Sequence, residues 1–258
     1  AVQDCGSAKH VTIRYQKGGA KVDKHTEKSV HGGDVYRNQV ELDFSVNINP
    51  FGMPDGVKKA LCDAIFLCTQ YPDEKVSKLS EAMAKKLDVP QECLLFGNGA
   101  SELFVAIIHA RKPKTVLVLA PSFSGYEHSA ACEDCQVRYY YLKKEDNFEL
   151  TEHFVQELIR QIKEHEAPDL IFLANPNNPT GATAPDAFYE ELIRFAKAND
   201  IIVLHDTAYS NLVFDGEEGR SFLYYEGAKD IGIEFNSFSK TYGMAGARIG
   251  ICVGNKEI

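Results

Sequence analysis

The sequence of 258 residues lacks the features of several specialised classes of protein. No apolar run is long enough to span a bilayer, and residues 1–30 lack the apolar core of a signal peptide. Positive charge is scarce, because 28 lysines and arginines oppose 37 acidic residues and leave a net charge of −9. We therefore expect a soluble cytoplasmic protein whose main partner is neither a membrane nor nucleic acid.

The chain also lacks a cysteine framework. It has seven cysteines, and an odd number in a chain of this size indicates free thiols rather than disulfides. Cys132 and Cys135 form a single C-x-x-C, and no second pair completes a four-ligand metal site. We therefore expect no bound metal, and we place this motif at the end of a helix that follows Tyr126.

Apolar runs with the length of strands alternate with helical patterns along the chain. The expected strands span residues 93–96, 115–120, 137–142, 169–174, 201–205, 231–236 and 247–253. Apolar residues recur at helical spacing in residues 76–87, 103–110 and 151–166, and Pro185 opens a further helix. This alternation is typical of an α/β fold with three layers, in which helices cover both faces of a mainly parallel sheet. Ligands of such sheets bind at the carboxyl ends of the strands.

Three residues separate Lys240 from the end of the expected strand 231–236, and Arg248 lies eight residues further on, in a glycine-rich turn. A lysine is an unusual choice for the buried end of a strand unless its amine has chemistry to do, such as forming a Schiff base. Serine hydroxyls, backbone N–H groups and an arginine beside it could hold a phosphate. These groups suggest pyridoxal 5′-phosphate (PLP), which needs a lysine for its aldehyde and an anion site for its phosphate. A surface lysine in a loop is the alternative.

Three other segments are compatible with such a site. Residues 93–110 predict a strand, a glycine loop and a helix, whose free N–H groups and dipole attract an anion. This is not a Walker A loop, because no Gly-Lys-Ser/Thr follows. Residues 175–181, Asn-Pro-Asn-Asn-Pro-Thr-Gly, form a rigid turn that carries side-chain amides after an apolar strand. Asp206 ends the next strand, with Tyr209 three residues on, and a buried aspartate needs a cationic partner such as a protonated pyridine nitrogen.

The order of these four segments resembles the fold-type-I PLP enzymes of the aminotransferase class I/II superfamily, over about residues 31–258. The closer likeness is to the branch of histidinol-phosphate aminotransferase and threonine-phosphate decarboxylase, through residues 31–34, 42–52, 71–73 and 97–99. The resemblance implies that residues 57–258 are the large, PLP-binding domain and that residues 31–56 carry the substrate segment and the first part of a small domain. Residues 1–30 are expected to be an arm or an expression remnant. The rest of the small domain, with the arginine that binds the substrate's carboxylate, is expected beyond Ile258.

The resemblance also implies a role for single residues. Lys240 would bind PLP as an imine and move the α-proton, Asp206 would keep the pyridine nitrogen protonated, and Tyr209 and Asn178 would hydrogen-bond the ring's 3-oxygen. The phosphate would lie against Gly99, Ala100, Ser101, Ser237, Ser239 and Arg248. Phe123 would stack on the ring, Tyr71 would reach the partner's phosphate in a homodimer, and the substrate would contact Asn47, Asn49 and Gly52. A plain core phenylalanine and a plain Asn-Pro turn are the alternatives for Phe123 and for the asparagines.

The function that the resemblance implies is transfer of an amino group between an amino acid and a 2-oxo acid. The amino acid would carry an imidazole, aromatic or phosphate-bearing side chain. A decarboxylase of L-threonine O-3-phosphate is the alternative with the same fold, although residues 239–250 are more similar to amino-transferring relatives. A PLP-binding regulatory module without turnover is a third alternative. It would need a DNA-binding domain, and residues 1–30 are too short for one and show no helix-turn-helix pattern.

Overall fold

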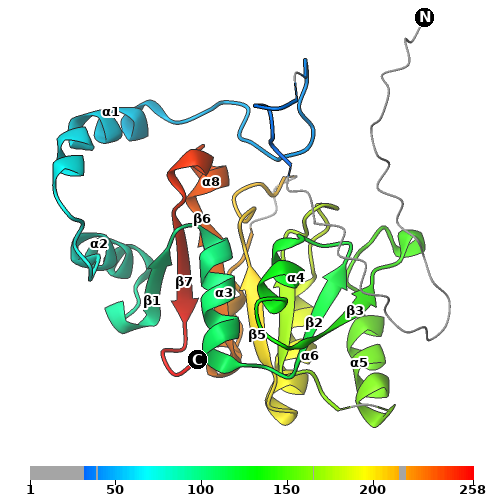
Figure 1. Ribbon diagram of the computed structural model, residues 1–258. Coiled ribbons are helices and arrows are strands. Elements are labelled where there is room, and N and C mark those ends of the chain that lie inside the picture. The colour runs from blue at the N-terminus through cyan, green and yellow to red at the C-terminus, as the bar shows by residue number, and fades with distance from the viewer. Residues whose placement is uncertain (1–31, 39, 165, 215–218) are drawn as a thin grey trace, which may run out of the picture. The chain divides into compact units, whose positions relative to one another are not determined.

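A mainly parallel sheet organises the fold. A computed structural model describes residues 32–38, 40–164, 166–214 and 219–258, and within these residues seven strands form one sheet (Figure 1). The predicted arm, residues 1–30, lies outside the described residues. The order across the sheet is β1-β7-β6-β5-β4-β2-β3. The strands are β1 (Leu94–Gly97), β2 (Thr115–Ala120), β3 (Gln136–Tyr141), β4 (Leu170–Ala174), β5 (Ile202–Asp206), β6 (Gly232–Ser237) and β7 (Gly250–Gly254).

Five of these strands, from β3 across to β6, run parallel to one another, and β7 runs antiparallel to both β6 and β1. Parallel neighbours require crossover connections, which helices usually supply. Here β1 leads into α3 (Ala100–Arg111), β2 into α4 (Gly125–Ala130), β3 into α5 (Glu152–Glu164) and β4 into α6 (Asp186–Ala198). The short segment between β6 and β7 needs no crossover, and it carries α8 (Phe238–Thr241) and the 3₁₀ turn η5 (Ala245–Ala247).

Both faces of the sheet are buried, because successive residues of a strand point to opposite sides. On one face Val118, Phe172 and Leu204 pack with α3 and with Tyr126 of α4. On the other face Leu117, Leu173 and Val203 pack with α5 and α6. Burying a Val, Leu or Phe side chain contributes about 1.5–3 kcal/mol to stability, so the two clusters supply most of the driving force for folding. The predicted arrangement of three layers, helix on sheet on helix, is confirmed.

Several predicted strands are shifted by one residue, and two differences at element ends have a clear local cause. The last strand begins at Gly250 rather than at residue 247, because residues 245–247 form η5 and Arg248 then adopts a left-handed conformation with φ of 53°. Val76 precedes the helix α2 (Ser77–Leu87) instead of lying inside it. Asp73 accepts hydrogen bonds from the backbone N–H groups of Val76 and Ser77, which turns the chain at φ of 51° just before the helix begins.

The part of the chain before β1 is largely exposed. It contains α1 (Asp55–Ala64), the 3₁₀ turns η1 (Ile65–Thr69) and η2 (Gln91–Cys93), and α2, and no residue of α1 or α2 is buried. Several large apolar side chains in this part face solvent, namely Tyr36, Phe44, Phe51, Ile65, Phe66 and Tyr71. Exposed apolar surface of this extent marks a site of interaction with another molecule or subunit.

The remaining short elements are η3 (Lys144–Asp146), η4 (Phe222–Tyr224) and α7 (Ala228–Ile231). Among the described residues, no helix has both the length and the apolar character needed to cross a membrane. Cys132 and Cys135 lie just after α4, in the place predicted for them, and six cysteines of the described chain are free thiols.

Candidate active site

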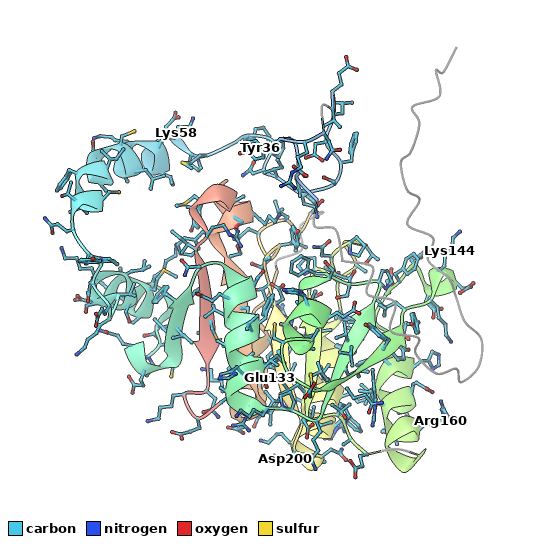
Figure 2. The ribbon with its side chains drawn as sticks, viewed as in Figure 1. Tyr36, Lys58, Glu133, Lys144, Arg160 and Asp200 are labelled. Carbon is cyan, nitrogen blue, oxygen red and sulfur yellow. The ribbon has the colours of Figure 1, made fainter. Side chains whose placement is uncertain are left out.

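Most of the predicted site residues gather where the parallel strands end. The ends of β4, β5 and β6 are neighbours, since Ala174 pairs with Asp206 and Asp206 pairs with Phe235 across the sheet. Asp200, which precedes β5, marks the opposite end of the strands, and the segment around Tyr36 lies beyond their carboxyl ends (Figure 2). The turn after β4, Asp206 at the end of β5 and Lys240 after β6 therefore share one edge of the sheet.

Asp206 is a buried carboxylate on the face that α3 and α4 cover. Its Oδ2 accepts a hydrogen bond of 2.7 Å from the Tyr126 hydroxyl, and its Oδ1 accepts one of 3.2 Å from the Ala208 backbone N–H. Burial raises the pKa of Asp206, and these two hydrogen bonds oppose that shift. Burial, together with the Asp206 charge, also raises the pKa of Tyr126 well above its usual value, so Tyr126 stays protonated and donates. A carboxylate buried in this way favours a cation beside it.

Lys240, Tyr209, Asn47 and Asn178 form a linked group beside Asp206. The Lys240 Nζ donates to the backbone carbonyl of Asn47 and lies 5.6 Å from the centroid of the Tyr209 ring. The Tyr209 hydroxyl oxygen accepts from the side-chain amides of Asn47, at 3.2 Å, and Asn178, at 3.4 Å. The segment around Asn47 is thereby brought to the carboxyl end of β5, as the predicted substrate role of Asn47 requires.

The electrostatic environment makes Lys240 a nucleophile candidate. Burial lowers the pKa of the Lys240 ammonium, the positive charge of Arg248 lowers it further, and Asp206 opposes both. Burial and the charge of Asp206 raise the pKa of Tyr209, while the hydrogen bond from Asn47 lowers it. A lysine whose pKa is lowered is neutral over a wider pH range, which is what attack on a carbonyl carbon requires.

The first turn of α3 and the Arg248 guanidinium form an anion site. The first N–H groups of a helix, here those of Ala100 and Ser101, have no partner within it and point outward. Gly99 precedes the helix with φ of 86°, and a Cβ on it would lie 2.5 Å from Arg248 Nη2. A Cβ on Gly250 would lie 2.3 Å from the Ala100 nitrogen. Both glycines are therefore needed for the guanidinium and β7 to approach the end of the helix.

Two buried serines, Ser237 and Ser239, follow β6. The Ser237 hydroxyl oxygen accepts from the Ser239 backbone N–H at 3.2 Å and so caps α8, the short helix that carries Lys240. Buried hydroxyls retain donor capacity for a ligand, because each can rotate its hydrogen toward an acceptor.

The three asparagines of the turn after β4 have different roles. The Asn175 Oδ1 accepts from the Ala184 N–H at 2.9 Å, and the Asn177 Oδ1 accepts from the N–H and hydroxyl groups of Thr180. These two side chains stabilise the turn itself. The Asn178 amide reaches Tyr209 instead, so it is the asparagine that contributes to the site.

Four predicted residues do not belong to the linked group around Lys240 and Tyr209. Asn49 Oδ1 accepts from the Phe51 N–H at 3.0 Å, so this side chain serves the turn, and Gly52, at φ of 69°, packs its carbonyl against Gly243. Phe123 makes an edge contact with the Tyr126 ring, with centroids 5.6 Å apart. Tyr71 is fully exposed, and the structure does not bring it to the site of its own chain.

Tyr126 is a residue of the candidate site that the sequence interpretation missed. Its ring is completely buried among Phe104 and Phe172, and its hydroxyl contacts Asp206 across 80 positions of the chain. The available signal was that a buried tyrosine hydroxyl finds a hydrogen-bond partner. The sequence does not indicate which of the several acidic residues that partner is.

Comparison with known proteins identifies the family. The family of class I and II aminotransferases matches residues 39–258. The chain is 30% identical over 240 residues to threonine-phosphate decarboxylase of Salmonella typhimurium, covering 89% of this chain and 63% of that protein. It is 33% identical over 248 residues to LL-diaminopimelate aminotransferase of Dehalococcoides mccartyi, covering 91% and 61%. A double mutant of Thermus thermophilus aspartate aminotransferase superposes with a TM-score of 0.73 at 26% identity, covering 82% of this chain and 56% of that one.

These matches confirm the resemblance predicted from the sequence and the fold of the PLP-dependent transferases. The chain spans about three fifths of the length of the curated relatives that it matches, 63% and 61% for the two described above.

Proposed function

The chain belongs to the class I and II aminotransferases, whose cofactor is PLP, and we propose that the protein transfers an amino group between an amino acid and a 2-oxo acid. The observation that carries this proposal is the meeting of four groups at one edge of the sheet. These are the Lys240 amine, the buried Asp206 carboxylate, the Tyr209 hydroxyl and the anion site at the start of α3.

The residues present are suited to PLP in charge and in chemistry. A phosphate dianion complements the N–H groups of Ala100 and Ser101 and the Arg248 guanidinium, and the absence of a Cβ at Gly99 and Gly250 is what keeps these groups close together. A protonated ring nitrogen complements Asp206, whose burial would otherwise be unfavourable. When bound, PLP supplies an aldehyde carbon that reacts with amines and a pyridine ring that withdraws electrons from the substrate's α-carbon.

Lys240 is the residue proposed to accept and return the α-proton in the reaction. Through Nζ it would hold the aldehyde carbon and would take up and return the proton of the substrate's α-carbon. Its lowered pKa favours the neutral amine that can accept this proton. The contact of Nζ with the Asn47 carbonyl shows that the amine reaches the segment expected to line the substrate site.

Asp206 and Tyr126 act on the ring nitrogen. The Tyr126 hydroxyl and the Ala208 N–H fix one oxygen each, so the carboxylate is held in place, and both hydrogen bonds oppose the rise in its pKa that burial causes. A carboxylate fixed in this way would favour the protonated form of the ring nitrogen when PLP is bound. Tyr209, whose hydroxyl oxygen accepts from Asn47 and Asn178, would donate to the ring's 3-oxygen.

Two candidate reactions, which act on different substrates, are compatible with these residues. We favour amino transfer from a substrate with an imidazole, aromatic or phosphate-bearing side chain, or with a second amino acid group like that named for the diaminopimelate relative. The likeness to a threonine-phosphate decarboxylase favours carbon dioxide release as the second candidate, because Lys240 and Asp206 would have the same roles in it.

A homodimer is part of the proposal. Tyr71 is fully exposed and lies in a part of the chain with several other exposed apolar side chains, among them Ile65 and Phe66. A second copy that covered this surface could receive Tyr71 at its phosphate site, and each site would then need both subunits.

The experiment that tests the function compares the two reactions directly. The full-length protein, purified and saturated with PLP, is offered amino acids together with 2-oxoglutarate, and glutamate is measured. In parallel, it is offered L-threonine O-3-phosphate alone, and carbon dioxide is measured. Glutamate without carbon dioxide supports the aminotransferase. Carbon dioxide without glutamate supports the decarboxylase instead of the aminotransferase. Protein that binds PLP but gives neither product contradicts both functions.

A further inference from the structure

His205 is a buried polar residue for which the proposed reaction has no use. It immediately precedes Asp206 on β5, and its side chain is 0% exposed. Because neighbouring residues of a strand point to opposite faces, its imidazole lies on the α6 side of the sheet while the Asp206 carboxylate lies on the α4 side. Across the sheet His205 pairs with Leu173 of β4 and with Glu234 of β6.

Three neighbours hold the imidazole. Its Nε2 lies 3.0 Å from the hydroxyl of Tyr189 on α6, and its ring stacks on Phe222 of η4 with centroids 5.2 Å apart. Its Nδ1 faces Glu234 Oε2 at 3.5 Å and has no hydrogen-bond partner among the described residues. That oxygen already accepts from the Ser221 hydroxyl and the Phe222 N–H, which fixes the carboxylate in place.

An apolar side chain would fill this space at lower cost. Burying a polar atom without a full set of hydrogen bonds is unfavourable, and cores of this kind usually use leucine or phenylalanine. The imidazole must therefore contribute something that an apolar side chain does not. What distinguishes its position is the single peptide unit that joins it to Asp206.

The backbone around Asp206 is tied to both neighbouring strands. The Asp206 carbonyl accepts from the Asn175 N–H at 3.0 Å, and the Thr207 N–H donates to the Phe235 carbonyl at 2.8 Å. These bonds hold the strand end between β4 and β6. On the α4 side the Asp206 carboxylate accepts the Tyr126 hydrogen bond, and on the α6 side the His205 imidazole contacts the Tyr189 hydroxyl, so contacts on both faces act on the same short stretch of backbone.

We propose that His205 is a positioning residue for Asp206, which it orients toward the ring nitrogen of the cofactor through the Tyr189 contact on the opposite face of the sheet. This inference rests on the proposed function, since it assigns Asp206 to that nitrogen. His205 does not touch cofactor or substrate. Its action passes through the backbone of β5.

The charges of His205 and Glu234 also affect the pKa of Asp206. Burial is the main cause that raises the pKa of Asp206; a charge on His205 lowers that pKa, and the charge of Glu234 raises it. The groups that face the imidazole are Glu234 from β6, Tyr189 from α6 and the apolar side chains of Leu173 and Phe222. Behind Tyr189 lies Tyr225, whose hydroxyl donates to Asp186.

The variants separate the polar contact from packing. His205→Phe keeps a ring on Phe222 and removes both polar contacts. His205→Gln retains an amide at the reach of Nε2 and can contact Tyr189, whereas His205→Asn retains one only at the position of Nδ1. Tyr189→Phe removes the partner hydroxyl alone. The matched control is Leu173→Val, because Leu173 is fully buried on the same face and pairs with His205, but has no polar atom.

Three quantities are measured for each variant: the thermal unfolding temperature without PLP, the dissociation constant for PLP, and the pH at which the visible absorption band of bound PLP changes. We expect His205→Phe and His205→Asn to raise the dissociation constant about tenfold, which corresponds to about 1.4 kcal/mol lost from the contact between Asp206 and the ring nitrogen. The band should change at higher pH, because a less firmly protonated ring nitrogen withdraws fewer electrons. His205→Gln should restore most of both values.

Leu173→Val should lower the unfolding temperature and leave the other two quantities unchanged. If His205→Phe and Leu173→Val behave alike, with lower stability and no change in affinity or spectrum, His205 is only a core residue and the inference is wrong. If His205→Phe does not fold, Tyr189→Phe decides: a shift of the band supports the inference, and an unchanged band contradicts it. Wild-type protein that binds no PLP would instead overturn the proposed function, and the inference with it.

Discussion

The Tyr126 hydroxyl donates a hydrogen bond of 2.7 Å to the Asp206 carboxylate across 80 positions of the chain, and both residues are buried. The Tyr126 ring also stacks on Phe172, with centroids 4.7 Å apart and planes 12° from parallel. The same side chain therefore belongs to the hydrophobic core through its ring and to the site through its oxygen.

Tyr126→Phe should remove the hydrogen bond to Asp206 and keep the packing of the ring on Phe172. We expect the free energy of unfolding to fall by about 1.5–3 kcal/mol, because the deleted bond is one to a buried charged group and is present without PLP. The pKa of Asp206 should rise further, since the Tyr126 hydrogen bond is the largest factor that lowers it. On acidification, the variant should therefore lose PLP affinity at a higher pH than the wild type does. Titration of binding between pH 5 and pH 8 checks this, and identical curves would contradict it.

Asp206→Asn should affect stability and turnover in opposite directions. A carboxyl whose pKa is raised by burial contributes stability that is present at low pH and is lost as pH rises through that pKa. Without PLP, the asparagine variant should therefore unfold at a higher temperature than the wild type at pH 7, and the difference should vanish below about pH 4. Turnover should fall by roughly a hundredfold or more, because the ring nitrogen loses its partner. A variant that is less stable than the wild type at pH 7 would contradict this account of Asp206.

Lys240 should carry the cofactor. Borohydride reduction of the PLP-saturated protein should fix the label on the peptide that contains Lys240, and Lys197, exposed in an ion pair with Asp230, serves as the unlabelled control. Because the pKa of Lys240 is lowered from 10.5, the rate of attachment should rise with pH and level off below that value. Stopped-flow absorbance gives the rate. A label on any other lysine would show that the assignment is wrong.

Gly99→Ala should damage the anion site. Its Cβ would lie 2.5 Å from Arg248 Nη2, and φ at this position is 86°. Strain of this kind costs about 1–3 kcal/mol, and the displaced guanidinium should also weaken binding of inorganic phosphate and of PLP. Gly246→Ala is the matched control, since nothing lies within 4 Å of a Cβ there. Equal phosphate affinities in the two variants would remove Arg248 from the proposed site.

Tyr71 should act in the site of the second subunit. Tyr71→Ala and Lys240→Ala are each expected to be inactive or nearly so as homodimers. In a mixed dimer, one site would combine Lys240 of the first variant with Tyr71 of the second and should regain activity. Mixing the unfolded variants and refolding them together tests this. The absence of any recovery, with dimers present by sedimentation, would place Tyr71 outside the site.

The sequence predicts the arrangement of elements better than the fine geometry of the site. The strands are recognisable because β4 is apolar throughout and β2 is apolar from Val116 onward, and the positions of Asp206 and Lys240 follow from where their strands stop. Contacts between distant segments do not follow from local pattern. The Tyr126 hydroxyl and the contact of Asn47 with Lys240 depend on how separate strands and loops meet in space.

Local conformation explains the errors at element ends. The strand expected from residue 247 begins later because Arg248 adopts a left-handed turn, which non-glycine residues rarely do and which apolar pattern cannot reveal. In the turn after β4, all three asparagines were compatible with a site role by residue type. The structure assigns two of them to the turn, because their side-chain oxygens accept hydrogen bonds from nearby backbone N–H groups.

The alternation of side chains along β5 makes the length of this strand as important as its composition. Side chains along a strand alternate between its two faces. Deleting or inserting one residue between Ile202 and Leu204 would therefore move each following side chain to the opposite face of the sheet. The carboxylate would then enter the apolar layer beneath α6, and the imidazole would face the cofactor. We therefore expect β5 to accept changes of residue size far more readily than a change in residue number, and natural variation in length to fall in the loops that precede it.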